Sequence, residues 1–317
     1  VKLSEDRVKG YRNFLNKMWN ANKFSKINKC KLSKKININK TRLDVNKWIY
    51  FKLARTSLET KKHILNFRFD EAAKTIYQFV WHSYCDWYIE FLKPILDDKN
   101  NINLDESRNM MAFVQANILT ILHPFIPFFT EKIWQDFNFN NYYKTQLMYK
   151  NWSIKDKKNF GKSYDKIDWL INLITNIRST KVDLNVPPGL FIDISTAELK
   201  PDKTKIINDN LDLFKKLGRV SIISKSKLNK NGVKIISGSE TITLYFDQSL
   251  DLKDQKEKIY RRVKDLENKI FNSHNKLNNK SFLKNAPKHI IIQEKEALIE
   301  SKIQLKKLNS VLNSIKN

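Results

Sequence analysis

The chain has 317 residues, 41% of them hydrophobic, which is enough to build more than one core and excludes a disordered tail. Its formal net charge of +26 favours an anionic partner, most commonly a phosphate backbone, although genome base bias toward Lys, Asn and Ile would also produce such an excess. Cys30 and Cys85 lie far apart, so the sequence excludes a disulfide framework and a cysteine metal site and fits a reducing cytoplasm. No apolar run approaches the roughly 20 residues that cross a bilayer, so a membrane span is excluded as well.

The opening helix is predicted from the string GYRNFLNKMWNANKF, Gly10 to Phe24. Five residues recur at helical spacing and form one broad apolar stripe: Tyr11, Phe14, Leu15, Met18 and Trp19. The opposite side is polar and basic: Arg12, Asn13, Asn16, Lys17, Asn20 and Lys23. Any bundle helix needs such a stripe, whereas the polar side points to RNA.

Further helices complete an all-helical bundle over residues 1–150. The second is expected to begin at Asp44, a plausible N-cap, and to run through Leu58. The third carries an apolar stripe that Pro94 is expected to end. The fourth stops at a His-Pro break, and Pro127 is well placed to start the fifth. Short links between these helices predict antiparallel neighbours.

Between residues 151 and 250 the pattern becomes mixed. A helix is expected from about Tyr164 to Lys181, and a second helical run covers about Lys203–Leu217. Four short β-rich runs read LFIDIS, RVSIIS, GVKIIS and TITLYF. Strands interleaved with two helices predict a small α/β connector domain, with one sheet and helices on a face.

Residues 251–317 carry heptad spacing on both sides of a break at about Ser281–Pro287, with a polar interruption at Ser273. The break allows the chain to reverse, so we predict an antiparallel coiled-coil hairpin. The alternative is a homodimeric coiled coil, which would make the protein associate with increasing concentration. The hairpin predicts a monomer.

The whole chain resembles the C-terminal part of the valyl-tRNA synthetases. The opening string closely resembles the first helix of their anticodon-binding domain, and FRFDEAAKTIYQFVWHSYCDWYIEFLKP, residues 67–94, resembles their second signature. LHPFIPFFTEKIW, residues 122–134, and IRSTKVDLNVPPG, residues 177–189, follow in the same order. Three positions depart from the family while keeping charge: Lys23 and Lys181 stand where Arg is usual, and Asp183 where Glu is usual.

The resemblance implies a mainly α protein: an antiparallel helical bundle of the class I synthetase anticodon-binding type, a small α/β connector and a C-terminal hairpin that forms a tRNA-binding arm. It implies that the chain positions valine tRNA for ATP-dependent aminoacylation and is inactive alone. The catalytic domain, which would use ATP with Mg, would have to be supplied in cis or in trans. No cofactor is expected in this chain. Because it begins with Val1, we expect it to be part of something longer.

The chemistry expected of these residues is RNA binding. Single-stranded bases need stacking surfaces and hydrogen bonds to their edges, and stems need cations along their phosphates. The candidate tRNA-binding residues are Arg12, Asn13, Asn16, Lys17, Asn20, Arg55, Arg178, Arg261, Arg262, Lys264 and Lys269. The tryptophans Trp19, Trp81 and Trp87 could stack on bases, but their stripe positions favour core packing.

No catalytic or metal-binding residue is expected. The five histidines have unrelated spacings without a cysteine or carboxylate cluster, and His82 with Asp86, one turn later, favours a surface hydrogen bond over an acid/base pair. The string KLSKK, residues 31–35, resembles the family's second catalytic signature. It follows the opening helix, whereas the family's signature precedes it, so we interpret it as a lysine-rich loop.

Two alternatives share parts of this pattern. One is a non-catalytic basic coiled-coil protein that binds RNA without sequence preference or serves as a scaffold. The other is the equivalent region of an isoleucine or leucine tRNA synthetase, which shares the bundle but matches the opening helix and the hairpin less well.

Overall fold

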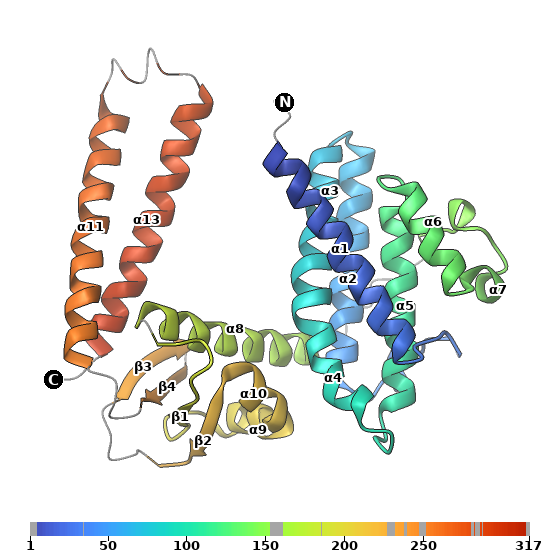
Figure 1. Cartoon of the computed structure of the whole chain (residues 1–317), viewed down its shortest axis with the longest axis horizontal. Helices are drawn as coiled ribbons and strands as arrows, with labels where there is room; N and C mark the ends of the chain where they lie inside the picture. Colours follow the sequence, from blue (N-terminus) through green and yellow to red (C-terminus); the bar gives the residue numbers. More distant parts are fainter. Residues whose placement is uncertain are drawn as a thin grey trace. The chain divides into compact units, whose positions relative to one another are not determined.

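The computed structural model of the chain forms two compact units, Val1–Asp168 and Trp169–Asn317 (Figure 1). It describes residues 5–33, 35–152, 161–184, 186–226, 232–237, 240–246, 252–279, 282, 286 and 288–314. None of the helices in these ranges is long and apolar enough to cross a membrane.

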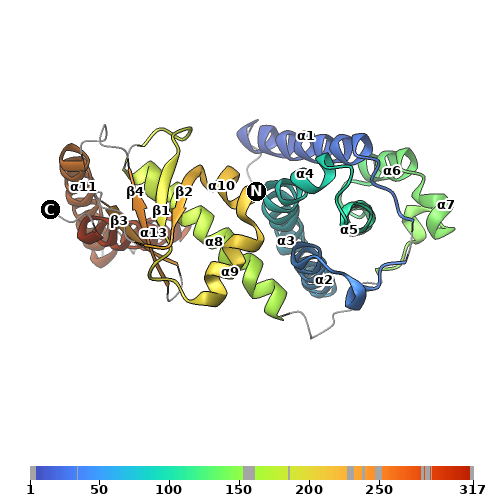
Figure 2. The ribbon, with the colours of Figure 1, turned by 90° about the horizontal axis from the view of Figure 1, so that it is seen from below.

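The first unit is a helical bundle built around one central helix. Viewed end-on, this helix, α5, is surrounded by the others (Figure 2). It is buried on nearly every side, including Met110, Val114 and Ile118 at 0% exposure. The elements of this unit are α1 (Glu5–Ile27), η1 (Ile38–Lys40), α2 (Asp44–Leu65), α3 (Phe69–Gln78), η2 (Phe79–Tyr88), α4 (Ile89–Asp97), α5 (Leu104–Leu122), α6 (Pro127–Asp136), α7 (Phe139–Tyr143), η3 (Leu147–Tyr149) and the first turns of α8 (Gly161–Asp183).

Polar side chains connect α5 to its neighbours. The carboxylate of Glu106 accepts hydrogen bonds from the amides of Arg42 and Leu43, at 2.8 and 3.2 Å, and from Asn46 Nδ2 at 2.9 Å. Asn46 in turn accepts a 2.8 Å bond from the hydroxyl of the buried Tyr88. The Glu106 carboxylate thus holds the start of α2 against α5, and Asn46 joins α2 to η2.

The start of α2 differs from the expectation in one detail. Asp44 is the first helical residue and not the cap, because Leu43 takes the cap position without a side-chain bond. The Asp44 carboxylate instead accepts bonds from Ser163 Oγ at 2.7 Å and Lys166 Nζ at 3.0 Å, both in α8. Burial raises the pKa of Asp44, but these two bonds outweigh it and hold that pKa below its ordinary value. Asp44 therefore ties α8 to α2.

The buried side of α1 is rotated from the expected apolar stripe. Phe14 and Met18 are buried as expected, but Tyr11 is 66% exposed and Trp19 is 43% exposed. Ala21 and Ser25 take their place in the interior, where Ser25 Oγ donates a 2.8 Å hydrogen bond to Gln115 of α5. Ser25 therefore faces α5, although the edge of the stripe that carries Tyr11 and Trp19 is more hydrophobic.

The expectation that Pro94 ends the third helix is wrong. The helical path continues from α3 through the π-helix η2 into α4, which contains Pro94 and ends at Asp97. A proline inside a helix removes one backbone bond and crowds the preceding turn. Here Leu92 and Leu96, on either side of it, are buried at 0% and 4% exposure, and this packing offsets the loss. The start of α6 at Pro127 is confirmed.

The second unit contains a four-stranded sheet with the order β2-β1-β4-β3. The strand β1 runs parallel to β2 and antiparallel to β4, and β3 pairs antiparallel with β4. The expected helical run at 203–217 is two helices, which separate at Asn210. The elements are the rest of α8, β1 (Ile192–Ser195), α9 (Pro201–Asp209), α10 (Leu211–Gly218), β2 (Val220–Ser224), β3 (Gly232–Ser237) and β4 (Glu240–Tyr245).

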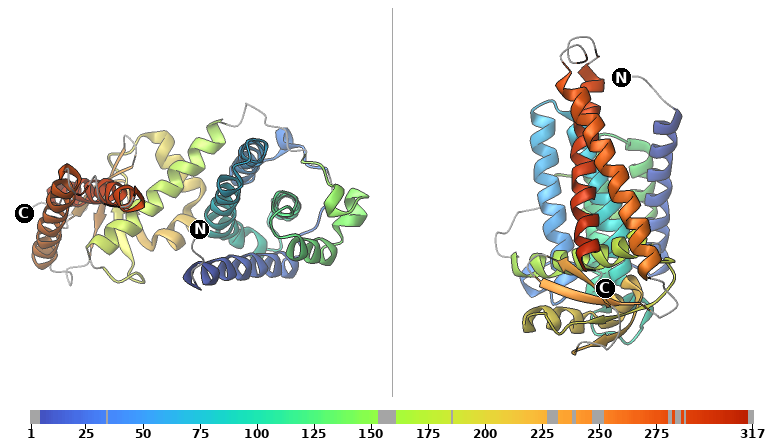
Figure 3. Two further views of the ribbon diagram at one scale, coloured as in Figure 1. Left: turned by 90° about the horizontal axis from the view of Figure 1, so that it is seen from above. Right: turned by 90° about the vertical axis from the view of Figure 1, so that its left-hand side faces the viewer.

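The same unit ends in two long helices, α11 (Leu252–Asn278) and α13 (Lys288–Ser314), which lie side by side as the expected hairpin (Figure 3). Heptad residues fill the seam, with Ile259, Val263 and Leu308 buried. Ser273, the polar interruption in the heptads, donates a 2.7 Å hydrogen bond to Glu294 of the facing helix. Of the break at 281–287, only Phe282 and Ala286 lie within the described residues.

We predict that Glu106→Ala lowers the free energy of unfolding by about 2 kcal/mol, because three donors lose a charged acceptor. Asp105→Ala is the matched control, since it also removes an acid from the first turn of α5 but is exposed; it should cost about 0.5 kcal/mol. Urea denaturation followed by circular dichroism measures both. Equal losses would show that Glu106 acts only on the dipole of its own helix.

Candidate nucleic-acid interface

The outward side of α1 is a continuous polar surface. Arg12, Asn13, Asn16 and Asn20 are all exposed, and Lys23 lies on the same side of the helix. Asparagine amides carry two donors and an acceptor and can pair with base edges, while an arginine fork suits a phosphate. This side therefore offers the groups that RNA recognition needs, and none of these five residues is buried in the bundle.

Lys17, which was grouped with that polar side, points into the first unit. Its ammonium forms an ion pair with Asp86 and lies 3.9 Å from the centroid of the Trp81 ring. Trp81 is part of a row of stacked rings, 5.5 Å from Tyr77, which lies 5.2 Å from Phe14. The charge of Lys17 is thus used to join α1 to η2.

The pair of His82 and Asp86 has the geometry of a surface contact. His82 Nδ1 lies 3.3 Å from the second carboxylate oxygen of Asp86, and the His82 side chain is 63% exposed. Asp86 therefore bridges Lys17 and His82. Within the described ranges, no group of three or more His, Cys, Asp or Glu residues could hold a metal ion.

Trp19 is the residue that the sequence interpretation placed wrongly. Core packing was favoured for it, yet it is 43% exposed, with its ring centroid 6.4 Å from that of Phe129 in α6. On a helix its neighbours are the residues three before and four after, Asn16 and Lys23. An aromatic face thus lies beside the polar surface of α1. Trp81 and Trp87 are half-buried.

Two further candidates are held by local partners. Arg55 is exposed and pairs with Glu59 one turn later on α2, at 3.1 Å. Arg178 of α8 donates a 2.9 Å hydrogen bond from Nε to the carbonyl of Leu217, near the end of α10. A cation at a helix C-terminus satisfies a free carbonyl and the helix dipole. Arg178 therefore has a structural role in the connector.

The neighbouring Lys181 is buried and donates hydrogen bonds to the carbonyls of Pro188 and Leu190. Burial lowers its pKa, and the nearby charges of Arg219 and Arg178 lower it further. These acceptors are separate carbonyls, which one ammonium can reach without the planar fork of an arginine. Lys181 holds the turn that follows α8.

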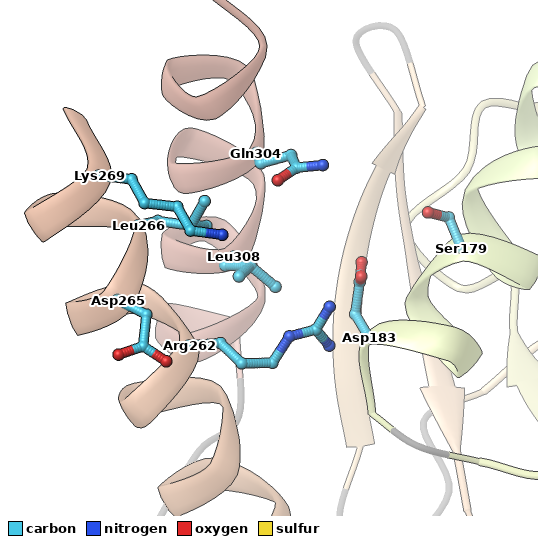
Figure 4. A pocket seen from close by; sticks show the side chains of 8 residues that line it. All are labelled: Ser179, Asp183, Arg262, Asp265, Leu266, Lys269, Gln304 and Leu308. Atoms are coloured by element: carbon cyan, nitrogen blue, oxygen red, sulfur yellow. The ribbon is translucent and has the colours of Figure 1, made fainter. Parts of the chain in front are cut away.

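The four cations of the hairpin lie on different sides of α11. Arg262 and Lys269 line a pocket of about 350 Å³ between the hairpin and α8, together with Asp183, Asp265 and Gln304 (Figure 4). All four cations are exposed, but Arg261 and Lys264 do not line this pocket. Arg261 lies 4.0 Å from Glu257. Sequence spacing predicts that all four lie on one helix, but it does not distinguish the two that line the pocket from the two that do not.

The loop that contains KLSKK begins after α1. The amide of Ser33 donates a 2.9 Å hydrogen bond to Asn109 of α5, which fixes this part of the loop on the bundle. Lys34 lies outside the described residues.

Comparison with known families identifies two regions. Residues 46–196 match the anticodon-binding domain of tRNA ligase, and residues 251–316 match the valyl tRNA synthetase tRNA binding arm. The first match covers most of the bundle, the whole of α8 and β1, and the second covers the hairpin.

Curated proteins show the same similarity. The valine–tRNA ligase of Pelagibacter ubique is 41% identical over 295 residues, which are 93% of this chain and 34% of that protein. The valine–tRNA ligases of Zymomonas mobilis and Bartonella quintana are each 32% identical over 99% of the chain and about a third of their own length. The chain thus spans about a third of these relatives and matches their C-terminal part.

We predict that Lys17→Met lowers the free energy of unfolding by about 1 kcal/mol, because the ion pair and the cation–π contact are both lost. Lys23→Met, an exposed lysine on the same helix, should change it by less than about 0.5 kcal/mol. Urea unfolding monitored by circular dichroism compares the two. A loss of the same size in both variants would contradict a structural role specific to Lys17.

Proposed function

Because the chain belongs to the valine–tRNA ligase family, we propose that it binds valine-accepting tRNA and positions it for aminoacylation by a catalytic domain outside this sequence. The observation that carries this proposal is the outward side of α1, where Arg12, Asn16, Asn20 and the half-exposed Trp19 present hydrogen-bonding groups beside an aromatic face. These are the groups that unstacked anticodon bases require.

We propose a division of work among three regions. Residues 1–150 bind the anticodon, and residues 251–317 form the arm that contacts phosphates. Residues 151–250 connect these two regions. The exposed Arg261 and Lys264 support the last role, because cations that face solvent can neutralise phosphates without reading sequence. Two separated contacts on one tRNA would fix its orientation as well as its affinity, and orientation lowers the barrier of a remote reaction.

In the intact ligase, ATP with Mg would activate valine as an adenylate, and the tRNA end would then accept the valine. This chain would contribute no reacting group to either step. Its part would be to hold the tRNA, as a cytoplasmic monomer whose two long helices pair within one chain.

We predict that the purified chain prefers a valine-accepting tRNA over the same tRNA with its anticodon replaced, and that the preference persists when salt is raised from about 50 to about 200 mM. Phosphate contacts weaken steeply with salt, whereas hydrogen bonds to bases and stacking depend less on it. Filter binding or fluorescence anisotropy measures both affinities. Equal and steeply salt-dependent binding to both RNAs would instead indicate a basic RNA-binding protein without sequence preference.

We predict that Trp19→Ala weakens binding to the native tRNA by about 1–3 kcal/mol, the usual value of one base stacked on an aromatic ring. Stability should change little, because the ring is 43% exposed. Leu58→Ala is the matched control, since Leu58 is 46% exposed on α2 and offers no stacking face. Unchanged affinity in Trp19→Ala would remove the aromatic face from the proposed anticodon site.

A further inference from the structure

We propose that Arg262 is a positioning residue that sets the direction of the hairpin through Asp183, and not one of the phosphate contacts of the arm. Figure 4 shows the guanidinium of Arg262 extending from α11 toward Asp183 at the end of α8. The proposal deepens the proposed function and rests on it only for its consequence, the placement of tRNA.

The position of Asp183 explains why it attracts a cation. It is the last residue of α8, where the helix dipole places partial negative charge and disfavours a carboxylate. This chain nevertheless has an acid at that position. A cation on the facing helix lowers the cost of that charge, and a guanidinium can bind a carboxylate through two parallel hydrogen bonds.

The spacing on α11 shows that Arg262 belongs to the side that faces α8. The α11 residues that line the pocket are spaced by three, one and three positions, which places them on one side of the helix: Arg262, Asp265, Leu266 and Lys269. In Figure 4 the Asp265 carboxylate lies beside α11, and Arg262 is the labelled side chain of α11 that extends toward Asp183.

The pocket itself makes charge important at this joint. A space of about 350 Å³ separates the described parts of α8 and the hairpin here, and Leu266 and Leu308 are the apolar residues that line it. Where the side chains of two helices do not interdigitate, dispersion contributes little to holding the helices together. The electrostatic attraction between charged side chains across the gap then decides how the hairpin is oriented on α8. The lining contains two cations and two carboxylates, so its charges cancel. A pocket without net positive charge is better suited to holding two helices together than to binding a phosphate.

The test measures the direction of the hairpin without RNA. Spin labels are placed at Lys205→Cys on α9 and Asn272→Cys on α11, both exposed, and the distance distribution between them is recorded by double electron–electron resonance. The native thiols should not be labelled, because burial raises the pKa of Cys30 to about 11 and that of Cys85 to about 12.

Arg262→Gln should broaden this distribution. The matched control Arg261→Gln removes the adjacent exposed arginine, which does not line the pocket, and should leave the distribution unchanged. Exchanging the charges in Arg262→Asp with Asp183→Arg should restore the narrow distribution. Circular dichroism checks that each variant keeps its helices.

Binding to tRNA gives the second readout. Arg261→Gln should reduce the slope of log affinity against log salt by about one, as expected for a lost phosphate contact, and Arg262→Gln should leave that slope unchanged. An unchanged distance distribution in Arg262→Gln, with a slope reduced as in Arg261→Gln, would overturn the proposal. The distance measurement contains no RNA. A chain that fails to bind tRNA would therefore contradict the proposed function without contradicting the positioning role of Arg262.

Discussion

The bundle depends on the burial of α5 on nearly all its sides, because a helix without a solvent face must find partners inside the protein for the polar groups that it carries. Three side chains of α5 accept hydrogen bonds from neighbouring segments and so fix the positions of those segments. Glu106 fixes the start of α2, Asn109 fixes the loop after α1, and Gln115 accepts a hydrogen bond from Ser25 of α1. The polar groups of one helix thus set the positions of three surrounding segments.

The proposed RNA surface follows from this packing. The interior side of α1 includes the small residues Ala21 and Ser25, and Ser25 bonds to Gln115 of α5, so hydrophobicity alone does not decide which side is buried. That choice turns Trp19 outward beside Asn16 and Lys23, where an aromatic face and polar groups meet. The orientation of α1 about its axis therefore decides both which of its residues join the core and which form the candidate site.

The large positive charge divides into two kinds in the described part of the chain. Lys17, Arg178 and Lys181 are engaged with a carboxylate, a ring or backbone carbonyls, and hold elements together. Arg12, Lys23 and Lys264 are exposed on helix surfaces and are available to phosphates. Net charge alone therefore overstates the cations that could contact RNA, and mutational tests need to separate the two kinds.

The sequence predicts the helical bundle, the four strands, the hairpin and the family, because these rest on periodicity, on proline and turn residues, and on local strings such as GYRNFLNKMWNANKF. It also placed Arg12, Asn13, Asn16 and Asn20 on an exposed face. The structure was needed to show that Trp19 is half-exposed, that the helix continues past Pro94, and that Lys17 and Arg262 point toward carboxylates. The physical reason is that these outcomes depend on partners distant in sequence, whose positions local spacing does not contain.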